Sequence, residues 1–317
     1  MTTARAALLR RLRSAEEAAA RKPLGQRVRH PVRAVVGGTY SRARWLPVRE
    51  TWARLFTGQR MRVTVPELAS LQLYRFGFIE PDVTTALILS LEPGTVFVDV
   101  GAHHGYHSLV ASHLVGEQGA VYAFEPSPAS YDVLRRNVRE LTNVHVHPVA
   151  ADATRGNRLL FDFGPRHSSL NTLLPTARVP PAERRGLRSR QQQVETVVLD
   201  SFFAQRNLRP DFVKIDAESS ELDVLRGMRH ALRHAAPVVA LEVGDYDGAT
   251  LSADCIEFLG WLGYRGFEYD GERFVPHERR DSYAYDNLFF ARADTSAFAV
   301  FSESAAQSSA RVPSQLA

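Results

Sequence analysis

The chain has 317 residues, of which 44% are hydrophobic and 23% charged, and its net charge at pH 7 is +4. This is enough apolar sequence to bury one full catalytic core with appendages. No apolar run reaches the roughly 18 residues that a transmembrane helix needs. The single cysteine, Cys255, excludes an internal disulfide framework and a cysteine-based metal cluster.

Charge is divided unevenly along the chain. Residues 1–62 hold 15 Arg and Lys against 3 Asp and Glu, a net charge of +12, whereas residues 63–317 hold 24 against 32, a net charge of −8. Residues 4–22 fit an amphipathic helix, and residues 23–60 are expected to form a loosely structured segment that docks on the domain. The basic arm is interpreted as solvated or as packing in a homo-oligomer, with a membrane surface, nucleic acid or an acidic partner as alternatives. Arginines interrupt each apolar stretch up to Arg62, so no secretory signal is expected and a cytoplasmic enzyme is the default.

From residue 61 onward, strands and helices alternate. Strands are expected at 62–65, 96–101, 120–125, 144–151, 211–217 and 237–243, and helices at 83–91, 106–115, 128–141, 219–232 and 251–262. Two final strands, near 264–269 and 287–292, fit an antiparallel hairpin at the sheet edge. This order predicts an α/β fold with a doubly wound, mostly parallel seven-stranded sheet.

The alternation breaks after residue 152. Residues 159–163 are expected to pair with 194–198, and residues 164–193 form a long arginine-rich loop, interpreted either as a lid over an anionic substrate or as a solvated flexible loop. Residues 294–317 are rich in Ser and Ala without periodicity and are expected to be a disordered tail. The predicted organisation is therefore a basic extension (1–60), a catalytic domain (61–293) and a tail (294–317).

Acidic residues close the expected strands. They are Asp99, Glu125, Asp152, Asp216 with Glu218, and Glu242. In a parallel sheet the ligand crevice lies outside the carboxyl ends of the strands, so this pattern predicts a row of carboxylates around one pocket.

The first strand leads into a turn between Gly101 and Gly105, followed by a helix. Glycine lets the backbone approach a ligand closely, and the first N–H groups of the helix offer an anion site. His103 and His104 fill the space between the glycines, so a pyrophosphate-binding fingerprint is absent. An acidic residue two positions before the first glycine suits a cationic ligand such as S-adenosylmethionine.

Two further carboxylates fit the rest of that cofactor. Glu125, 20 residues after Gly105, is placed to accept both ribose hydroxyls. Asp152 is a candidate acceptor for the adenine amino group. On the fourth strand, Lys214 and Asp216 share one face. Because burying either charge alone is costly, they are expected to pair with each other, to meet other partners or to face the pocket. Glu221 is interpreted as a helix-capping residue or a functional one.

Several motifs together resemble the FkbM family of S-adenosylmethionine-dependent methyltransferases. They are residues 97–108 (FVDVGAHHGYHS), 124–126 (FEP), 196–202 (TVVLDSF) and 213–221 (VKIDAESSE). The resemblance extends from about Gly77 to Val243 and implies a class I methyltransferase, a group of which many members act on hydroxyl groups of natural products or sugars. The cofactor-binding residues predicted from these motifs are Asp99, Gly101, Ala102, His103, Gly105, Ser108, Glu125 and Pro126, together with Asp152. The resemblance also implies a site near the reactive methyl group at Asp216 and Glu218.

Two residues depart from the family's usual pattern. His103 stands where the family usually has Asn, and Ser219 stands where it usually has Gly. His103 still offers a hydrogen-bond donor, whereas Ser219 is expected to alter the turn into the following helix.

Methyl transfer to an alcohol needs alignment of the acceptor, exclusion of water and a general base. The candidate bases are Asp216, Glu218, Glu242 and His103, with Lys214 as a further catalytic residue. We expect no obligatory metal. The predicted function is O-methylation of a hydroxyl group on a small molecule. The alternatives are an RNA or protein methyltransferase and a cofactor-binding scaffold that has lost turnover.

Overall fold

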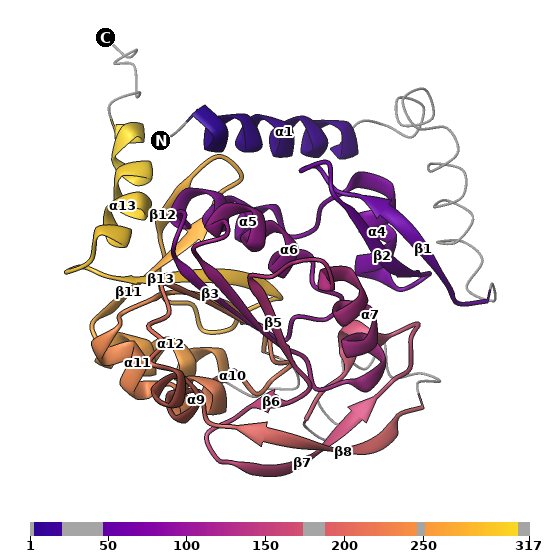
Figure 1. Cartoon of the computed structure of the whole chain (residues 1–317). Coiled ribbons are helices and arrows are strands. Elements are labelled where there is room, and N and C mark those ends of the chain that lie inside the picture. Colours follow the sequence, from indigo (N-terminus) through magenta and orange to yellow (C-terminus); the bar gives the residue numbers. More distant parts are fainter. Residues whose placement is uncertain (1–2, 21–46, 174–187, 246–250, 310–317) are drawn as a thin grey trace.

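A central sheet organises the computed structural model, which describes residues 3–20, 47–173, 188–245 and 251–309. Within these residues eight strands form the sheet, in the order β12-β11-β13-β10-β9-β3-β4-β5 (Figure 1). Their bounds are β3 Val96–Val100, β4 Ala120–Phe124, β5 Val144–His147, β9 Phe212–Ile215, β10 Val238–Val243, β11 Tyr264–Tyr269, β12 Phe274–Pro276 and β13 Asp286–Arg292. The predicted doubly wound sheet is confirmed, and β12 adds a short strand to the seven that were expected.

Strand direction follows from the connections. β3, β4, β5, β9 and β10 run parallel. β13 pairs antiparallel with both β10 and β11, and β12 pairs antiparallel with β11. Strands joined through a helix become parallel, whereas β11, β12 and β13 follow one another without an intervening helix.

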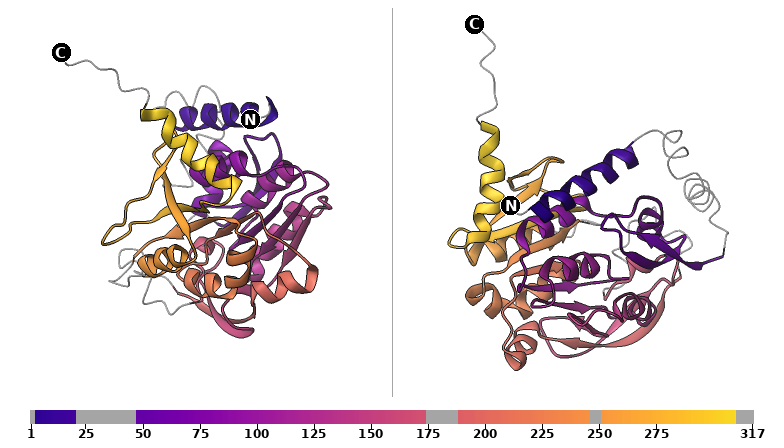
Figure 2. Two further views of the ribbon diagram at one scale, coloured as in Figure 1. Left: turned by 90° about the vertical axis from the view of Figure 1, so that its left-hand side faces the viewer. Right: turned by 45° about the horizontal axis from the view of Figure 1, so that its top comes forward.

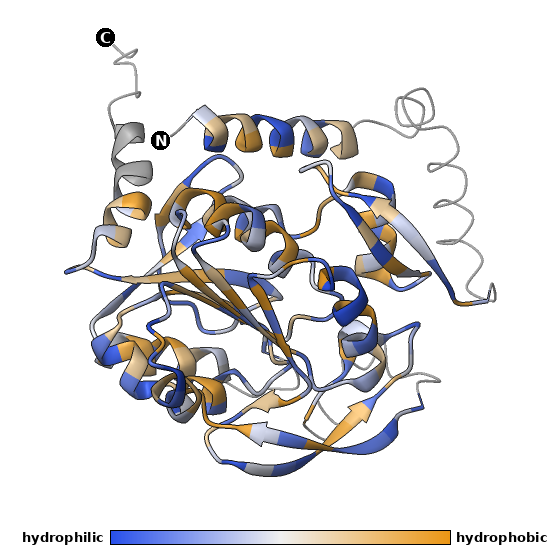
Figure 3. Ribbon diagram, viewed as in Figure 1, coloured by the Kyte–Doolittle hydropathy of each residue, from blue (hydrophilic) through white to orange (hydrophobic). Residues whose placement is uncertain are grey.

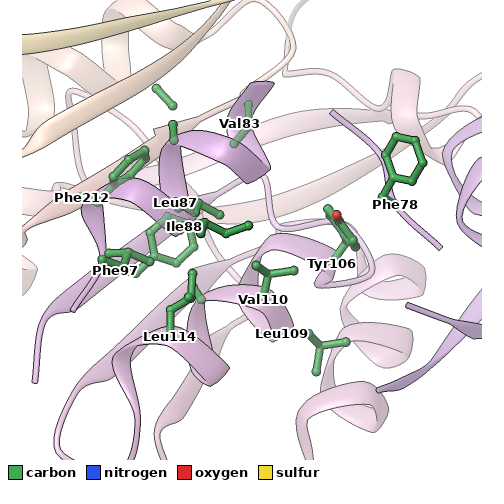
Figure 4. Close-up of a cluster of buried hydrophobic side chains, with 14 of the residues drawn as sticks. Phe78, Val83, Leu87, Ile88, Phe97, Tyr106, Leu109, Val110, Leu114 and Phe212 are labelled. Carbon is green, nitrogen blue, oxygen red and sulfur yellow. The ribbon is translucent and has the colours of Figure 1, made fainter. Parts of the chain in front are cut away.

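Helices cover both faces of the sheet. These helices are α5 Pro81–Ser90, α6 Tyr106–Val115, α7 Pro128–Val138, α9 Leu199–Arg206, α10 Glu221–Gly227, α11 Arg229–His234 and α12 Leu251–Trp261. The preceding helix, α4 Leu68–Phe76, packs against residues 49–65 instead. Side chains alternate along the strands, so that Phe97 and Phe212 pack against α5 and α6 while Val98 and Val213 belong to the core under α9 to α12. Figure 4 shows Leu87 and Ile88 of α5 over the first of these faces. The central strands are accordingly apolar along most of their length (Figure 3).

The N-terminal segment is an integral part of one core. The expected amphipathic helix forms as α1 (Thr3–Ala20), which lies across the domain next to α5 (Figure 2) and buries Leu8 and Leu12. Its apolar face is therefore covered by this chain. β1 (Arg49–Arg54) and β2 (Arg60–Val65) form an antiparallel hairpin against α4, so the expectation of loose structure is wrong for residues 49–60, and the domain boundary expected at residue 60 falls inside the hairpin. Residues 21–46 lie outside the described part of the chain.

The expected disordered tail is wrong for residues 296–309, which form α13 (Ser296–Ser309). Phe301 of this helix is fully buried against the rings of Phe267, Phe274 and Phe289. Phe298 of the same helix also contacts Phe267. These few apolar residues leave no long periodic pattern in a Ser/Ala-rich segment, which is why the sequence pattern missed the helix.

The segment after β5 leaves the main sheet. The strand expected over 144–151 is divided at Pro148, which has no N–H to donate to a ladder, and residues Ala150–Ala151 form β6 in a separate sheet of order β6-β8-β7. β7 (Gly156–Asp162) and β8 (Arg190–Val197) pair antiparallel, so these two segments do meet. Their register differs from the expected one, because residues 159–162 lie opposite 190–193 and not opposite 194–198. The predicted loop 164–193 therefore contains the start of β8 and a short 3-10 helix, η1 (Ser168–Leu170); residues 174–187 lie outside the described residues.

The helix expected over 219–232 is likewise divided, into α10 and α11, at Met228. No helix among the described residues combines the length and the apolar character needed to cross a membrane.

Candidate active site

A cavity of about 530 Å³ lies at the carboxyl ends of β3, β4 and β9. This is the position where a doubly wound sheet reverses its strand order and binds ligands. The lining combines the turn after β3, the residues after β4 and β9, the η1 segment, and residues of α4 and the α4–α5 turn. The structure brings Gly101, Ala102, His103, Glu125, Pro126, Lys214, Asp216 and Glu218 of the predicted site into this lining.

Gly101 is fixed by a close backbone approach. Its φ is 74°, and a Cβ added there would lie 1.8 Å from the carbonyl oxygen of Asp216. Any other residue would therefore separate the two loops that carry the predicted cofactor and catalytic residues. The N–H groups of Gly101 and Ala102 both donate to the carbonyl of Phe124, at 3.0 and 3.1 Å, which ties this turn to the end of β4.

Glu125 connects the same turn to the start of α7. Its Oε2 accepts from the N–H of His103 at 2.8 Å, and its Oε1 accepts from the N–H of Ser127 at 2.8 Å. Burial raises the pKa of Glu125 to about 7, and the two hydrogen bonds oppose this rise only in part. The predicted ribose acceptor thus lies in the lining with a fixed orientation.

Asp99, Ser108, Lys214 and Asp216 form a buried polar network. Asp99 and Lys214 are neighbours in register on β3 and β9. Lys214 Nζ lies 2.9 Å from Asp216 Oδ2 and 4.0 Å from Asp99 Oδ1, and Ser108 Oγ donates to Asp99 Oδ2 at 2.6 Å. Burial alone would lower the pKa of Lys214, but the surrounding carboxylates together raise it. The expected Lys214–Asp216 pair is therefore present, whereas Asp99 and Ser108 lie behind the lining.

The turn after β9 has an unusual backbone. Glu218 and Ser219 have φ values of 47° and 77°, in the left-handed region. Glu221 stabilises the turn, because its Oε1 accepts from the N–H groups of Ala217 and Ser219, both at 3.0 Å. Burial raises the pKa of Glu221 to about 7. Glu221 thus acts within the described structure as a support for the loop that carries Glu218.

The η1 segment links the two loops from the far side of the cavity. Ser168 Oγ lies 2.8 Å from His103 Nε2, and Thr172 Oγ1 donates to the carbonyl of Glu218 at 2.6 Å. His103 has a φ of 50° and stacks on His104 with ring centroids 3.8 Å apart. Burial lowers the pKa of His103 below its usual value. Residues 168–172 belong to the segment for which a lid was one of two interpretations, but the sequence named no residue of it as part of the site.

Three other predicted residues do not reach the lining. Gly105 begins α6 with a φ of 88°. Asp152 follows β6 in the smaller sheet, and its carboxylate is held by Arg158 Nε at 2.9 Å and by the N–H of Thr154 at 3.1 Å. Its adenine role stays a prediction, with both carboxylate oxygens already engaged. Glu242 lies behind Asp216, and burial raises its pKa well above the usual value.

Two groups of side chains have the composition of metal sites. Ligand-type atoms of Asp216, Glu218 and Glu242 lie within 4.8 Å of one another. A second set with the same spacing is Glu67, His103 and His104. The expectation that no metal is obligatory stays a prediction.

Glu80, His107 and Tyr285 also line the cavity, and sequence patterns gave none of them a role. Glu80 caps α5 from the α4–α5 turn, His107 lies in the first turn of α6, and Tyr285 precedes β13. These residues come from elements far apart in the sequence. Only the dipeptide Glu80-Pro81 at a helix start offered a local signal, and that signal indicates a helix boundary rather than a site.

The lining fits S-adenosylmethionine. Among its described residues, four carboxylates (Glu80, Glu125, Asp216 and Glu218) face one lysine, Lys214. Carboxyl groups outnumber the one lysine in this lining, which suits the sulfonium and ammonium groups of the cofactor. Apolar side chains of Val149, Ala150 and Leu160 complete the wall next to Glu125 and offer a surface for an aromatic base.

Comparison with known proteins agrees with these features. The pattern that defines the Methyltransferase FkbM domain matches residues 99–269, more than half of the chain. The chain is 33% identical over 182 residues to the 31-O-demethyl-FK506 methyltransferase FkbM of Streptomyces tacrolimicus, covering 51% of this chain and 70% of the relative. It is 26% identical over 179 residues to the hexuronic acid methyltransferase AglP of Haloferax volcanii, covering 56% and 68% respectively. A crystal structure of a methyltransferase FkbM from Methylobacillus flagellatus is 16% identical, with a TM-score of 0.41, over 70% of this chain and 54% of that one.

The match includes the turn after β3, Glu125 and the Lys214–Asp216 pair, which are the residues that the structure gathers around one cavity. The predicted family and cofactor are therefore confirmed. The chain belongs to the FkbM family of S-adenosylmethionine-dependent methyltransferases.

Proposed function

We propose that this methyltransferase acts on a hydroxyl oxygen of a small molecule, such as a sugar or another natural product. The observation that carries the proposal is that one cavity joins the glycine turn and Glu125 to an apolar wall of α4. The same cavity also reaches Glu80, Lys214 and Asp216. Its volume of about 530 Å³ is in the range of small-molecule sites, which is roughly 300–1,000 Å³.

The two curated relatives support this substrate class. One is named for 31-O-demethyl-FK506 and the other for a hexuronic acid. The chain aligns with about two thirds of each relative.

The charge of the lining favours an acceptor without negative charge, which would distinguish this chain from the relative named for a hexuronic acid. Lys214 is the cation among the described lining residues, and Asp216 already pairs with it. An anionic acceptor would meet the uncompensated carboxylates at close range. Six arginines of the loop 164–193 motivated the idea of an anionic substrate. Arg178, Arg184 and Arg185 lie outside the described residues, and Arg166, Arg188 and Arg190 are described but are not among the residues that line the cavity.

S-adenosylmethionine supplies a methyl group that is already activated on a sulfonium. The chain's own residues then bind and orient the cofactor and the acceptor, and they exclude water from the cavity. Glu125 and the Gly101 turn hold the cofactor, and Lys214 fixes the side chain of Asp216 at the bottom of the cavity. Leu68 and Leu73 of α4 provide an apolar wall for the acceptor. Such alignment of the two reactants supplies a large part of the rate of a displacement reaction.

Incubation with methyl-labelled cofactor and a panel of methyl glycosides, polyols and phenols tests the proposal. A labelled product that resists alkaline hydrolysis is a methyl ether and supports it. A base-labile methyl ester would show transfer to a carboxylate instead. Label recovered in RNA or protein would favour the macromolecular alternatives, and cofactor binding without any transfer would favour the scaffold.

A further inference from the structure

Glu80 and His107 face each other in the cavity lining with no hydrogen-bond partner at the facing atoms. Glu80 Oε2 lies 3.6 Å from His107 Nε2. Both atoms are buried and make no hydrogen bond within the described residues, while the two side chains are 23% and 6% exposed. Buried polar atoms without partners are rare because each is costly. The pair is therefore placed to receive a polar group of a ligand.

The backbone of Glu80 is held in a strained conformation. Its φ and ψ are 42° and 69°, although the residue before a proline normally adopts an extended backbone. The N–H of Thr84 donates to the carbonyl of Glu80 at 2.9 Å, and Thr84 Oγ1 donates to the carbonyl of Ile79 at 3.2 Å. Such strain persists where the surroundings fix it, and it gathers at functional sites.

Three other carboxylates in or beside the cavity already have partners. Asp216 Oδ2 is bound by Lys214, and both oxygens of Glu125 accept backbone N–H groups. Glu242 is hydrogen-bonded to Tyr285. By contrast, Oε2 of Glu80 has no hydrogen-bond donor among the described residues, and this side chain lines the end of the cavity formed by α4 and the α4–α5 turn.

We propose that Glu80 Oε2 accepts the proton of the acceptor hydroxyl during methyl transfer, with His107 as the residue that positions the carboxylate. This step rests on the proposed function. The acceptor's O–H bond breaks and its oxygen bonds to the methyl carbon. The carbon–sulfur bond breaks with its electron pair left on sulfur, which becomes a neutral thioether, and the proton ends on Glu80.

The charges around Glu80 set the pH at which it can act. Burial raises the pKa of Glu80 to about 8, with Asp216, Asp82 and Asp99 adding to the rise and Lys214 opposing it. The other groups that face it are His107, Tyr106 and Tyr285. Burial lowers the pKa of His107 well below its usual value, so this imidazole is neutral at pH 7. A general base works best with a pKa near the working pH, so the rate should rise as the pH passes through about 8.

Glu80→Gln tests the role because it keeps the shape and removes the proton acceptor. With labelled cofactor and a methyl glycoside, kcat should fall by about 10²- to 10⁴-fold and lose its rise near pH 8, while the cofactor Kd stays within a few fold. With an acidic phenol as acceptor the loss should be much smaller, because the hydroxyl ionises by itself. Glu92→Gln, at an exposed position, is the matched control and should leave both rates unchanged. A loss equal for glycoside and phenol would overturn the assignment.

A measurement without turnover separates this proposal from the proposed function. Because the pKa of Glu80 is higher in the folded state than in the unfolded chain, the free energy of unfolding should decrease as the pH rises toward about 8. Denaturant unfolding of Glu80→Gln should show a smaller decrease than wild type between pH 6 and 8.5, and an identical decrease would overturn the proposal. Label transferred only to carboxylates or amines would instead contradict the proposed function, while the pH effect of Glu80→Gln would still report on the ionisation of Glu80.

Discussion

At the scale of the residue, the backbone conformation shows why the family usually has Asn at the position of His103 and Gly at the position of Ser219. Ser219 has a φ of 77°, where glycine is favoured, and His103 has a φ of 50°, where asparagine is several-fold enriched among non-glycine residues. The positions at which the family usually has Gly and Asn are thus left-handed positions. This chain tolerates the strain because Glu221 and Ser168 hold the two turns.

Ser219→Gly should therefore stabilise the protein. Removing the Cβ relieves left-handed strain of about 1–2 kcal/mol, and the greater freedom of glycine in the unfolded chain cancels roughly half of that gain. We expect the free energy of unfolding in urea to increase by up to about 1 kcal/mol. Ser220→Gly is the matched control, because its φ of −110° needs no glycine, and this variant should lose stability. If Ser219→Gly lost as much stability as Ser220→Gly, the backbone of Ser219 would not be strained.

Glu125→Ala should weaken cofactor binding at least tenfold, which corresponds to about 1.4 kcal/mol. The carboxylate is expected to accept the ribose hydroxyls, and it also holds the N–H of His103 in the turn. Titration calorimetry with S-adenosylhomocysteine gives the affinity, with the exposed Glu140→Ala as control. Unchanged affinity in Glu125→Ala would show that Glu125 does not bind the cofactor.

At the scale of the element, α13 is a structural part of the domain. Phe301 is 0% exposed and contacts three aromatic rings contributed by β11, β12 and β13. The helix therefore covers the part of the sheet that lies beyond the parallel strands (Figure 1).

Phe301→Ala should lower the free energy of unfolding by about 3–5 kcal/mol, because it removes buried surface and leaves a cavity. Trp261→Ala removes a larger ring that is 80% exposed, so it should change stability by less than about 0.5 kcal/mol. Denaturant unfolding of both variants makes the comparison. Equal effects would mean that α13 adds little to the fold.

At the scale of the whole molecule, buried carboxyl groups make stability depend on pH. Burial raises the pKa of Glu125 and of Glu221 to about 7, above the usual 4.5. Their stabilising contribution is complete below pH 4.5 and is lost as the pH rises through about 7, because the unfolded chain releases these protons first.

The free energy of unfolding should therefore decrease between pH 5 and pH 8, and the Tm should decrease with it. Glu221→Gln should reduce this slope, even if it also lowers stability at every pH. Thermal unfolding at several pH values measures the effect, and a slope that Glu221→Gln leaves intact would show that this carboxyl does not titrate in the range.

The sequence by itself determined the parallel α/β sheet and the turn at Gly101. It also determined the place of Glu125 at a strand end and the position of Lys214 and Asp216 on one face of a strand. Each of these depends on residues close together in the chain: strand periodicity, a strand followed by a turn, or two side chains two positions apart on one face. Tertiary structure decided the rest. Asp152 was assigned to the wrong sheet because partner choice depends on β8, more than 40 residues away, and α13 was missed because its anchor needs three distant rings. Glu80 and His107 meet only because the α4–α5 turn and α6 fold against the same sheet end, and contacts between such distant segments leave no local pattern in one sequence.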